Sequence, residues 1–301
     1  MSASQARMAG VFPILVTPFD TQGRVDEESL RRLVEFNVEA GVHGLGIALG
    51  SEVLRLSEAE RVQVTRIVVD QVRQRVPVVV NTGAQGTDLA VLYSRTAEEN
   101  GADALMVMPP TAIPCGPAEV REYFRAISDA VRIPIFIQDT PTTPVSGGLS
   151  LQIAGESEQV RYVKVESAPP AQKVAEAVAQ AGDLLTIFGG AGGNYFIEEL
   201  RRGSRGTMPG CSQPEVFVAV WNCFAAGDLA GARAAFDRGI APVNRIAGQT
   251  WGAFYHVHKE ILRRRGILSC AAVRGPMAPL DELTRRELDE VIAELYDGEG
   301  R

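Results

Sequence analysis

Val160-Arg161-Tyr162-Val163-Lys164-Val165-Glu166 is a short run of mostly apolar residues that ends in a lysine and a glutamate. Short runs of this composition are typical of buried strands in a parallel sheet. Similar runs recur along the chain and predict eight strands, at residues 11–16, 44–48, 77–81, 104–108, 134–138, 160–164, 184–188 and 206–208. Helical periodicity fills the intervals between many of them, at residues 27–40, 57–73, 88–100, 117–130 and 170–181. Regular alternation of eight strands with helices predicts an α/β fold, the (β/α)8 TIM barrel.

Three further patterns refine this organisation. Ser57 is followed three residues later by Glu60, the pattern of a capping box at a helix start. After residue 224 the strand pattern ends, and residues 228–247, 250–264 and 281–296 are predicted to be helices. Residues 268–279 contain Gly275, Pro276 and Pro279 and are predicted to form a loop. We therefore expect a catalytic barrel over residues 1–226 and a C-terminal helical bundle over residues 227–301 that packs on it.

Composition excludes several classes of function. The chain has 301 residues, of which 46% are hydrophobic and 22% are charged, with a net charge of −7 and a pI near 5.2. This acidic balance argues against a nucleic acid or an anionic membrane as partner. No stretch approaches the ~18 consecutive apolar residues of a membrane span, and the N-terminus lacks the apolar core of a secretion signal. We therefore expect a cytoplasmic protein.

Cysteine and histidine spacing argues against a metal site. The four cysteines lack CxxC spacing, and two of the three histidines are two residues apart, which places them on different faces of a helix. They are Cys115, Cys211, Cys223 and Cys270, with His43, His256 and His258. We predict neither a metal nor a disulfide framework.

The candidate chemistry lies in the run that opens this section. Active sites of barrels are built at the carboxyl ends of the strands, and among these ends only that of residues 160–164 supplies a lysine. Because side chains alternate along a strand, Lys164 and Glu166 should face the same way. An amine that burial deprives of solvation becomes a nucleophile for a ketone, and a carboxylate beside it moves protons. A solvated lysine at a strand end, or a structural ion pair at the barrel rim, is the alternative.

Other strand ends supply candidate substrate contacts. Gly50 and Ser51 follow the second strand and could offer N–H groups and a hydroxyl to a carboxylate, although Gly-Ser is also a common turn. The run FGGAGGN, which contains Gly190, allows a ligand to approach the backbone closely, and tight packing of the loop explains it equally well. It lacks GxGxxG spacing, so we do not predict a dinucleotide. The remaining candidates at strand ends are Thr17, Pro110 and Met208.

Three motifs in order along the chain give a resemblance to a known family. They are TPFD at residues 17–20, the lysine of the sixth strand, and GTMPG at residues 206–210. The chain resembles the dihydrodipicolinate synthase and N-acetylneuraminate lyase superfamily over nearly its whole length. The resemblance implies a barrel with a C-terminal helical bundle, an imine between Lys164 and a 2-keto acid without any other cofactor, and a homo-oligomer such as a tetramer.

Departures from the synthase pattern argue against lysine biosynthesis. Where the synthases have GTTGE this chain has ALGSE, so Leu49 and Gly50 replace both threonines. Gln138 aligns with the catalytic tyrosine, and Thr143 or a neighbour aligns with the arginine that holds a dicarboxylate.

The segments MPP, IQDTP, VKVES and GTMPG instead resemble the branch that contains 2-keto-3-deoxy-L-arabonate dehydratase. In that branch a glutamate two residues past the lysine takes the place of the tyrosine as acid/base, which matches Glu166. The branch usually has a tyrosine after MPP, where this chain has Thr111.

These features lead to one hypothesis and two rivals. We expect a 2-keto-3-deoxy sugar acid to bind with its carboxylate on Gly50 and Ser51 and its carbonyl at Lys164. Glu166 then removes a C3 proton, and the enamine expels the C4 hydroxyl, while Gln138 hydrogen-bonds the imine region or a substrate hydroxyl. A pyruvate-releasing aldolase uses the same imine but breaks C3–C4. A non-catalytic 2-keto acid binding protein is the third alternative.

Overall fold

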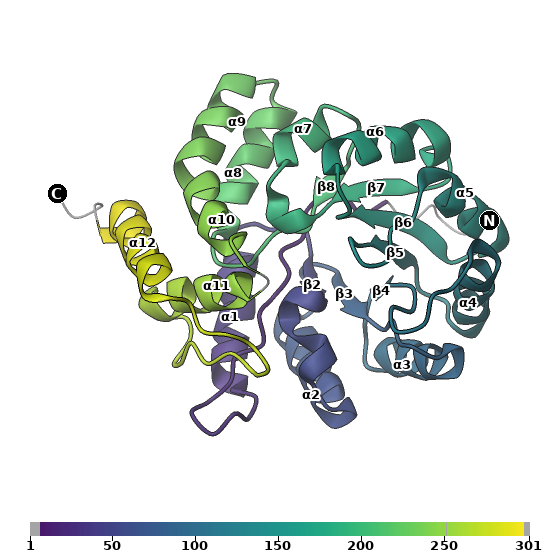
Figure 1. The fold of residues 1–301 in the computed structure, drawn as a ribbon, viewed down its shortest axis with the longest axis horizontal. Coiled ribbons are helices and arrows are strands. Elements are labelled where there is room, and N and C mark those ends of the chain that lie inside the picture. The colour runs from purple at the N-terminus through teal and green to yellow at the C-terminus, as the bar shows by residue number, and fades with distance from the viewer. Residues whose placement is uncertain (1–6, 251, 298–301) are drawn as a thin grey trace. The chain divides into compact units, whose positions relative to one another are not determined.

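The computed structural model describes residues 7–250 and 252–297. Eight strands alternate with helices along this chain and further helices follow the last strand, so the fold is a (β/α)8 barrel with a C-terminal helical appendage, as predicted (Figure 1). The chain divides into two compact units. Unit 1 comprises Met1–Phe12 and Pro77–Pro209, and unit 2 comprises Pro13–Val76 and Gly210–Arg301. The predicted domain boundary between residues 226 and 227 stays a prediction.

Unit 1 holds seven of the eight strands, in the order β1-β8-β7-β6-β5-β4-β3. Neighbouring strands in this order pair in parallel, as helical connections between consecutive strands require. The strands are β1 (Gly10–Val11), β3 (Val78–Asn81), β4 (Ala104–Val107), β5 (Ile135–Asp139), β6 (Val160–Val165), β7 (Thr186–Gly189) and β8 (Gly206–Thr207). The helices are α3 (Thr87–Glu99), α4 (Pro117–Ala130), α5 (Gly147–Glu156), α6 (Pro170–Ala181), η3 (Ala191–Gly193) and α7 (Phe196–Leu200).

A cluster of buried aromatic side chains packs around Tyr162, two residues before Lys164 on β6. Tyr162 stacks on Phe136, with ring centroids 4.3 Å apart, and Phe188 meets Phe136 edge-on at 5.5 Å. Phe12 packs edge-on against Phe188 at 5.3 Å. Because Tyr162 and Lys164 are two residues apart on one strand, they project from the same face. The lysine therefore stands above buried aromatic rings.

Unit 2 contains one strand, β2 (Leu45–Ile47), and the remaining helices. Before the C-terminal part these are α1 (Glu27–Glu39), η1 (Leu49–Ser51), η2 (Val53–Arg55) and α2 (Glu58–Val72). The predicted capping box is confirmed, because Ser57 Oγ accepts from Glu60 N at 3.3 Å and Glu60 Oε2 accepts from Ser57 N at 2.8 Å. The C-terminal part holds α8 (Pro214–Ala225), α9 (Leu229–Ala235), η4 (Phe236–Ile240), α10 (Ala241–Ala247), α11 (Ala253–Arg264), α12 (Glu282–Ile292) and η5 (Ala293–Asp297).

The structure corrects two local expectations. The strand predicted at residues 11–16 ends early, because Pro13 has no N–H to donate to a ladder, and Ile14 keeps only isolated bridges such as that to Gly46. Helix α5 was not predicted, since its sequence begins with two glycines and lacks a polar face. Ser146 nevertheless caps it by accepting from Leu149 N at 3.1 Å.

A buried ion pair ties the elements of unit 2 together. Lys259 on α11 and Glu52 are both fully buried, and their Nζ and Oε1 atoms are 2.5 Å apart. Lys259 also donates to Ala272 O at 2.8 Å, and the second oxygen of Glu52 accepts from Arg274 N at 2.9 Å. Burial lowers the pKa of the Lys259 amine, while Glu52 opposes that shift. The pair joins the turn after β2 to the helix and loop of the C-terminal part.

Replacing Lys259 by methionine should therefore destabilise the protein strongly. Glu52 would keep a buried charge and lose the cation at 2.5 Å, with Arg55 at 4.0 Å as a remaining ion-pair partner, and breaking a buried pair in this way costs about 3–5 kcal/mol. Urea unfolding of Lys259→Met measures the loss. The double variant Lys259→Met, Glu52→Gln should regain part of it, because no isolated charge remains. Equal stability of the single and double variants would show that the charge of Glu52 is not the cause.

Candidate active site at the end of strand β6

Lys164 and Glu166 form an ion pair at the end of β6. The distance from Lys164 Nζ to Glu166 Oε1 is 2.6 Å, and the side chains are 4% and 18% exposed. The predicted shared orientation is therefore confirmed, and the lysine is not a solvated residue at a strand end. The Glu166 side chain is therefore partly accessible to solvent, whereas the Lys164 side chain is almost completely buried.

Gln138 is held beside this pair by the pairing of β5 with β6, in which Gln138 lies opposite Lys164. Its Nε2 donates to Glu166 Oε2 at 2.9 Å, and its Oε1 accepts from Asn81 Nδ2, at the end of β3, at 3.3 Å. Each carboxylate oxygen of Glu166 thus has its own partner, the amine on one and the amide on the other. Gln138 orients Glu166, a contact that the sequence analysis did not foresee.

Gly190 lies directly against the ion pair. A Cβ atom built on Gly190 would overlap Glu166 Cγ and would lie 3.0 Å from both Lys164 Cε and the Val165 carbonyl oxygen. Of the two explanations for the glycine run after β7, tight packing of the loop against the barrel is what the structure shows at Gly190, and close approach of a ligand stays a prediction. A side chain at this position would displace the two groups that carry the candidate chemistry.

Three of the other candidates, Thr17, Gly50 and Ser51, belong to unit 2. Within unit 2, Thr17 Oγ1 donates to Ser51 O at 2.6 Å, and Ser51 Oγ donates to Leu15 O and accepts from Ala48 N. The only proton of the Ser51 hydroxyl is therefore used inside the unit. A Cβ on Gly50 would meet Ile14 Cγ2 at 3.0 Å, which explains its lack of a side chain. A role of these residues in binding a carboxylate stays a prediction.

The remaining candidates lie on strand ends of unit 1. Met208 is buried, and its N–H donates to Gly189 O at 3.1 Å. Pro110 precedes Thr111, whose N–H donates to Gln85 Oε1 at 2.9 Å while its hydroxyl accepts from Gln85 Nε2 at 3.0 Å. Gln85 thus fixes the loop that follows β4. Contacts of Met208 and Pro110 with a substrate stay predictions.

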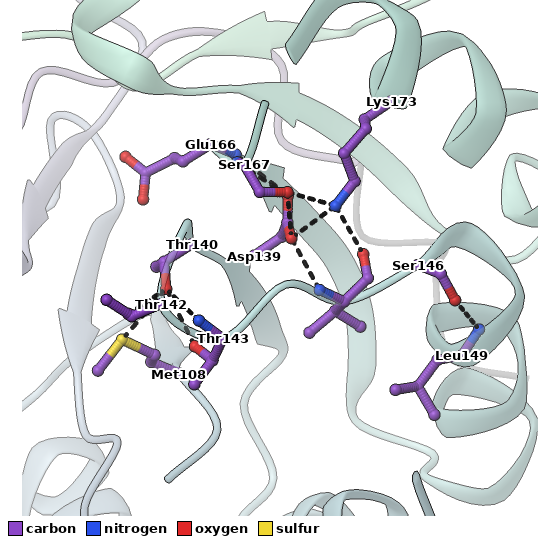
Figure 2. Close-up of polar contacts among 11 residues, drawn as sticks. Met108, Asp139, Thr140, Thr142, Thr143, Ser146, Leu149, Glu166, Ser167 and Lys173 are labelled. Carbon is purple, nitrogen blue, oxygen red and sulfur yellow. Dashed lines mark hydrogen bonds and ion pairs between the residues drawn. The ribbon is translucent and has the colours of Figure 1, made fainter. Parts of the chain in front are cut away.

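Behind the ion pair lies a second charged cluster that the sequence analysis missed. Asp139 ends β5, Ser167 follows Glu166, and Lys173 belongs to α6. The carboxylate of Asp139 accepts from Ser167 Oγ and from Lys173 Nζ, the latter at 2.9 Å. Figure 2 shows this cluster on one side of the end of β6, with the carboxylate of Glu166 pointing away from it. Barrel sites form at the carboxyl ends of strands. That rule could have drawn attention to this cluster, because Asp139 and Ser167 both lie at strand ends.

The lysine content sharpens the chemical interpretation. The chain has three lysines, Lys164, Lys173 and Lys259. Lys173 pairs with Asp139, and Lys259 pairs with Glu52 and is fully buried. Lys164 is the one whose partner carboxylate is partly exposed. A proton passed from the Lys164 ammonium to Glu166 over 2.6 Å would leave a neutral amine beside a carboxylic acid.

The fold and this site define a class: a (β/α)8 protein with a buried amine and a carboxyl group in contact at the end of the sixth strand. The model of the "Dihydrodipicolinate synthetase family" matches residues 7–295, and the chain belongs to that family.

Individual relatives agree with this assignment. The chain is 31% identical over 301 residues to L-2-keto-3-deoxyarabonate dehydratase of Azospirillum brasilense, covering 98% of this chain and 96% of the relative. It is 33% identical over 300 residues to 4-hydroxy-tetrahydrodipicolinate synthase of Sorangium cellulosum, covering 97% of each. The crystal structure of dihydrodipicolinate synthase from Rhodopseudomonas palustris superposes with a TM-score of 0.88 at 29% identity, over 95% of this chain and 97% of that one. The family is one of lyases, and so is this chain.

Residues 7–250 and 252–297 contain no group of three or more histidine, cysteine, aspartate or glutamate side chains arranged to hold a metal ion. Among the helices of the same residues, none has the length and apolar character needed to cross a membrane.

Proposed function

We propose that this chain is a lyase that forms an imine between Lys164 and a 2-keto acid, and that it dehydrates a 2-keto-3-deoxy sugar acid. The observation that carries the proposal is the contact between Lys164 and Glu166. A nucleophilic amine and a proton carrier lie in contact, as attack on C2 and proton removal from the adjacent C3 require. The relative that is a dehydratase supports this choice of substrate class.

The steps balance with these two groups alone. The neutral amine of Lys164 adds to the C2 carbonyl, the carboxylic acid of Glu166 gives its proton to the departing hydroxyl, and loss of water leaves the iminium beside the Glu166 carboxylate. Glu166 takes a proton from C3, and the electron pair forms the enamine. The enamine then expels the C4 hydroxyl, which takes the proton back from Glu166 and leaves as water. Hydrolysis of the remaining imine returns the amine and releases a keto acid that has lost one water.

Gln138 has a supporting role in this proposal. Its amide donates to Glu166 Oε2, so it fixes the plane of the carboxyl group while Oε1 of Glu166 faces the amine. An amide neither gains nor loses a proton during turnover, so it orients without competing for the transferred proton. This differs from the predicted contact with the imine region or a substrate hydroxyl, which stays a prediction.

The aldolase alternative rests on the relative that is a synthase, and it shares the imine. It differs in the bond that breaks, since a retro-aldol step cleaves C3–C4 and releases pyruvate. Product analysis separates the two: pyruvate as the sole keto product contradicts the dehydratase, and a keto acid one water lighter than the substrate contradicts the aldolase. A homo-oligomeric state and a cytoplasmic location are also part of the proposal.

Borohydride trapping tests the imine itself. Reduction in the presence of pyruvate, and of a panel of 2-keto-3-deoxy sugar acids, should add one ligand mass per chain, because hydride converts the iminium to a stable amine. Peptide mapping needs to distinguish only three lysines, and the adduct is expected on Lys164, with Lys173 and Lys259 unmodified. Binding of a keto acid without any adduct would favour a non-catalytic binding protein, and an adduct on another lysine would refute the assignment.

A further inference from the structure

The buried carboxylate of Asp139 accepts hydrogen bonds from three segments of unit 1: the loop before α5, the residues after β6, and helix α6. Val145 N, in the loop before α5, donates to Oδ1 at 2.8 Å, and Ser167 N donates to Oδ2 at 3.1 Å. The hydroxyl of Ser167 donates to the same carboxylate, at 2.6 Å from Oδ2. Asp139 has no exposed surface, so these bonds replace the water it would otherwise bind. The side chain of Asp139 thereby joins the end of β5 to the end of β6 and to the loop between β5 and α5 (Figure 2).

Lys173 balances the charge of this buried group. Its Nζ lies 2.9 Å from Asp139 Oδ1 and 3.5 Å from Val145 O, and it also contacts Ser167 Oγ. The lysine side chain is 15% exposed. A buried carboxylate is stable when it is both paired and fully hydrogen-bonded, and Asp139 meets both conditions. Lys173 also marks the first turns of α6, so the charge pair fixes this helix against the strand ends.

The same cluster holds the backbone of Glu166. Glu166 N donates to the backbone oxygen of Asp139 at 3.0 Å, and it lies 3.4 Å from Asp139 Oδ2. The neighbour of Asp139 on β5, Gln138, holds the other end of Glu166 by its bond to the carboxylate. Consecutive residues of one strand point to opposite faces, so β5 fixes Glu166 at its main chain and at its side chain at once.

We propose that Asp139, Ser167 and Lys173 form a positioning network that sets the reach of Glu166 to the substrate carbon, without themselves touching substrate. This inference rests on the proposed function, in which Glu166 transfers the C3 proton. A displacement of about 1 Å in a proton carrier reduces the rate by up to about 100-fold. The network acts on the reach of Glu166 to C3, whereas imine formation uses the amine of Lys164 and its direct contact with Glu166, so the two steps respond differently to its loss.

Pyruvate separates the two steps experimentally. In D2O the iminium of pyruvate loses a C3 proton to Glu166, and the enamine takes up deuterium from the exchanged carboxyl group, which proton NMR follows as loss of the methyl signal. Borohydride trapping on the same samples reports the imine. We expect Asp139→Asn and Ser167→Ala to keep the adduct yield within about twofold and to slow exchange about 10- to 100-fold. Ser167→Thr keeps a hydroxyl and should restore most of the exchange rate.

Charge pairing gives a second test. Lys173→Met leaves Asp139 unpaired and should slow exchange, whereas the double variant Asp139→Asn, Lys173→Met removes both charges and should exchange faster than Lys173→Met alone. Ser146→Ala is the matched control, because the hydroxyl of this exposed serine in the same loop accepts from Leu149 N and has no contact with the Asp139 network among the described residues. Its exchange rate should equal that of the wild type. Thermal unfolding of each variant shows whether it is folded under the conditions of the assay.

The outcomes separate this inference from the proposal on which it rests. If the wild type gives neither an adduct on Lys164 nor exchange that Glu166→Gln abolishes, the proposed function is wrong, and the positioning network falls with it. If both appear but folded Asp139→Asn and Ser167→Ala exchange at the wild-type rate, the network is only structural and this inference is overturned. A parallel loss of adduct and exchange in folded variants overturns it as well, because the network would then act on the amine.

Discussion

Lys164→Ala is expected to lower turnover of the keto acid at least about 1,000-fold and to abolish the borohydride adduct. The variant lacks the atom that forms the covalent bond, and the amines of Lys173 and Lys259 are each engaged with another carboxylate. Steady-state kcat and kcat/KM with the keto acid that traps best, together with intact mass after reduction, give the two measurements.

Lys164→Arg distinguishes a nucleophile from a structural ion pair. Arginine keeps a positive charge beside Glu166, so a purely structural role would preserve both fold and turnover. A guanidinium remains protonated in proteins and does not condense with a ketone at neutral pH. We therefore expect Lys164→Arg to be nearly as inactive as Lys164→Ala while unfolding closer to the wild type. Substantial turnover by the arginine variant would contradict the imine mechanism.

The features of the site that follow from local geometry could be predicted from the sequence. Alternation along a strand places Lys164 and Glu166 on one face whatever their neighbours are, and the contact at 2.6 Å agrees with this rule. The eight strands and the capping box at Ser57 are likewise set by patterns a few residues long. The strand predicted to start at residue 11 starts at residue 10, and Pro13 ends it earlier than its apolar composition indicates.

Contacts that depend on the register between elements could not be predicted in the same way. Gln138 meets Glu166 because β5 and β6 pair with Gln138 opposite Lys164, and a shift of one residue would turn Gln138 to the other face. Lys173 meets Asp139 only because α6 begins at Pro170, which brings its first turns to the end of β5. Sequence spacing contains neither fact, so Gln138 was assigned to substrate and the Asp139 cluster was missed.

Glu199 is expected to have a large effect on how the free energy of unfolding depends on pH. This residue lies on α7, is fully buried, and among the described residues neither of its carboxyl oxygens has a hydrogen-bond partner. It packs against Gly189 so closely that a Cβ atom there would overlap the carboxyl group. Thr207, which pairs with Gly189 across the sheet, has a buried hydroxyl that also lacks a partner among those residues. Burial, and to a lesser degree the charges of Glu198 and Glu166, raise the pKa of Glu199 to about 8.

The sign of the effect follows from proton binding. The pKa of Glu199 is about 8 in the folded protein and has an ordinary value of 4.5. Below pH 4.5 the carboxyl group is protonated in both states. Between 4.5 and 8 the unfolded chain loses this proton while the folded chain keeps it, so stability falls as pH rises, by about 1.4 kcal/mol per pH unit. Above pH 8 the penalty is complete, at about 5 kcal/mol.

Glu199→Gln should remove this penalty, because an amide of the same shape stays neutral in both states. We expect its free energy of unfolding to match that of the wild type near pH 4.5, to exceed it by about 3 kcal/mol at pH 7, and by about 5 kcal/mol above pH 8. Urea unfolding from pH 5 to pH 9 measures the difference, in which the titration of all other groups cancels. Glu99→Gln, at an exposed carboxylate on α3, is the control and should run parallel to the wild type. A parallel profile for Glu199→Gln as well would mean that this carboxyl group is ionised, and therefore solvated, in the folded protein.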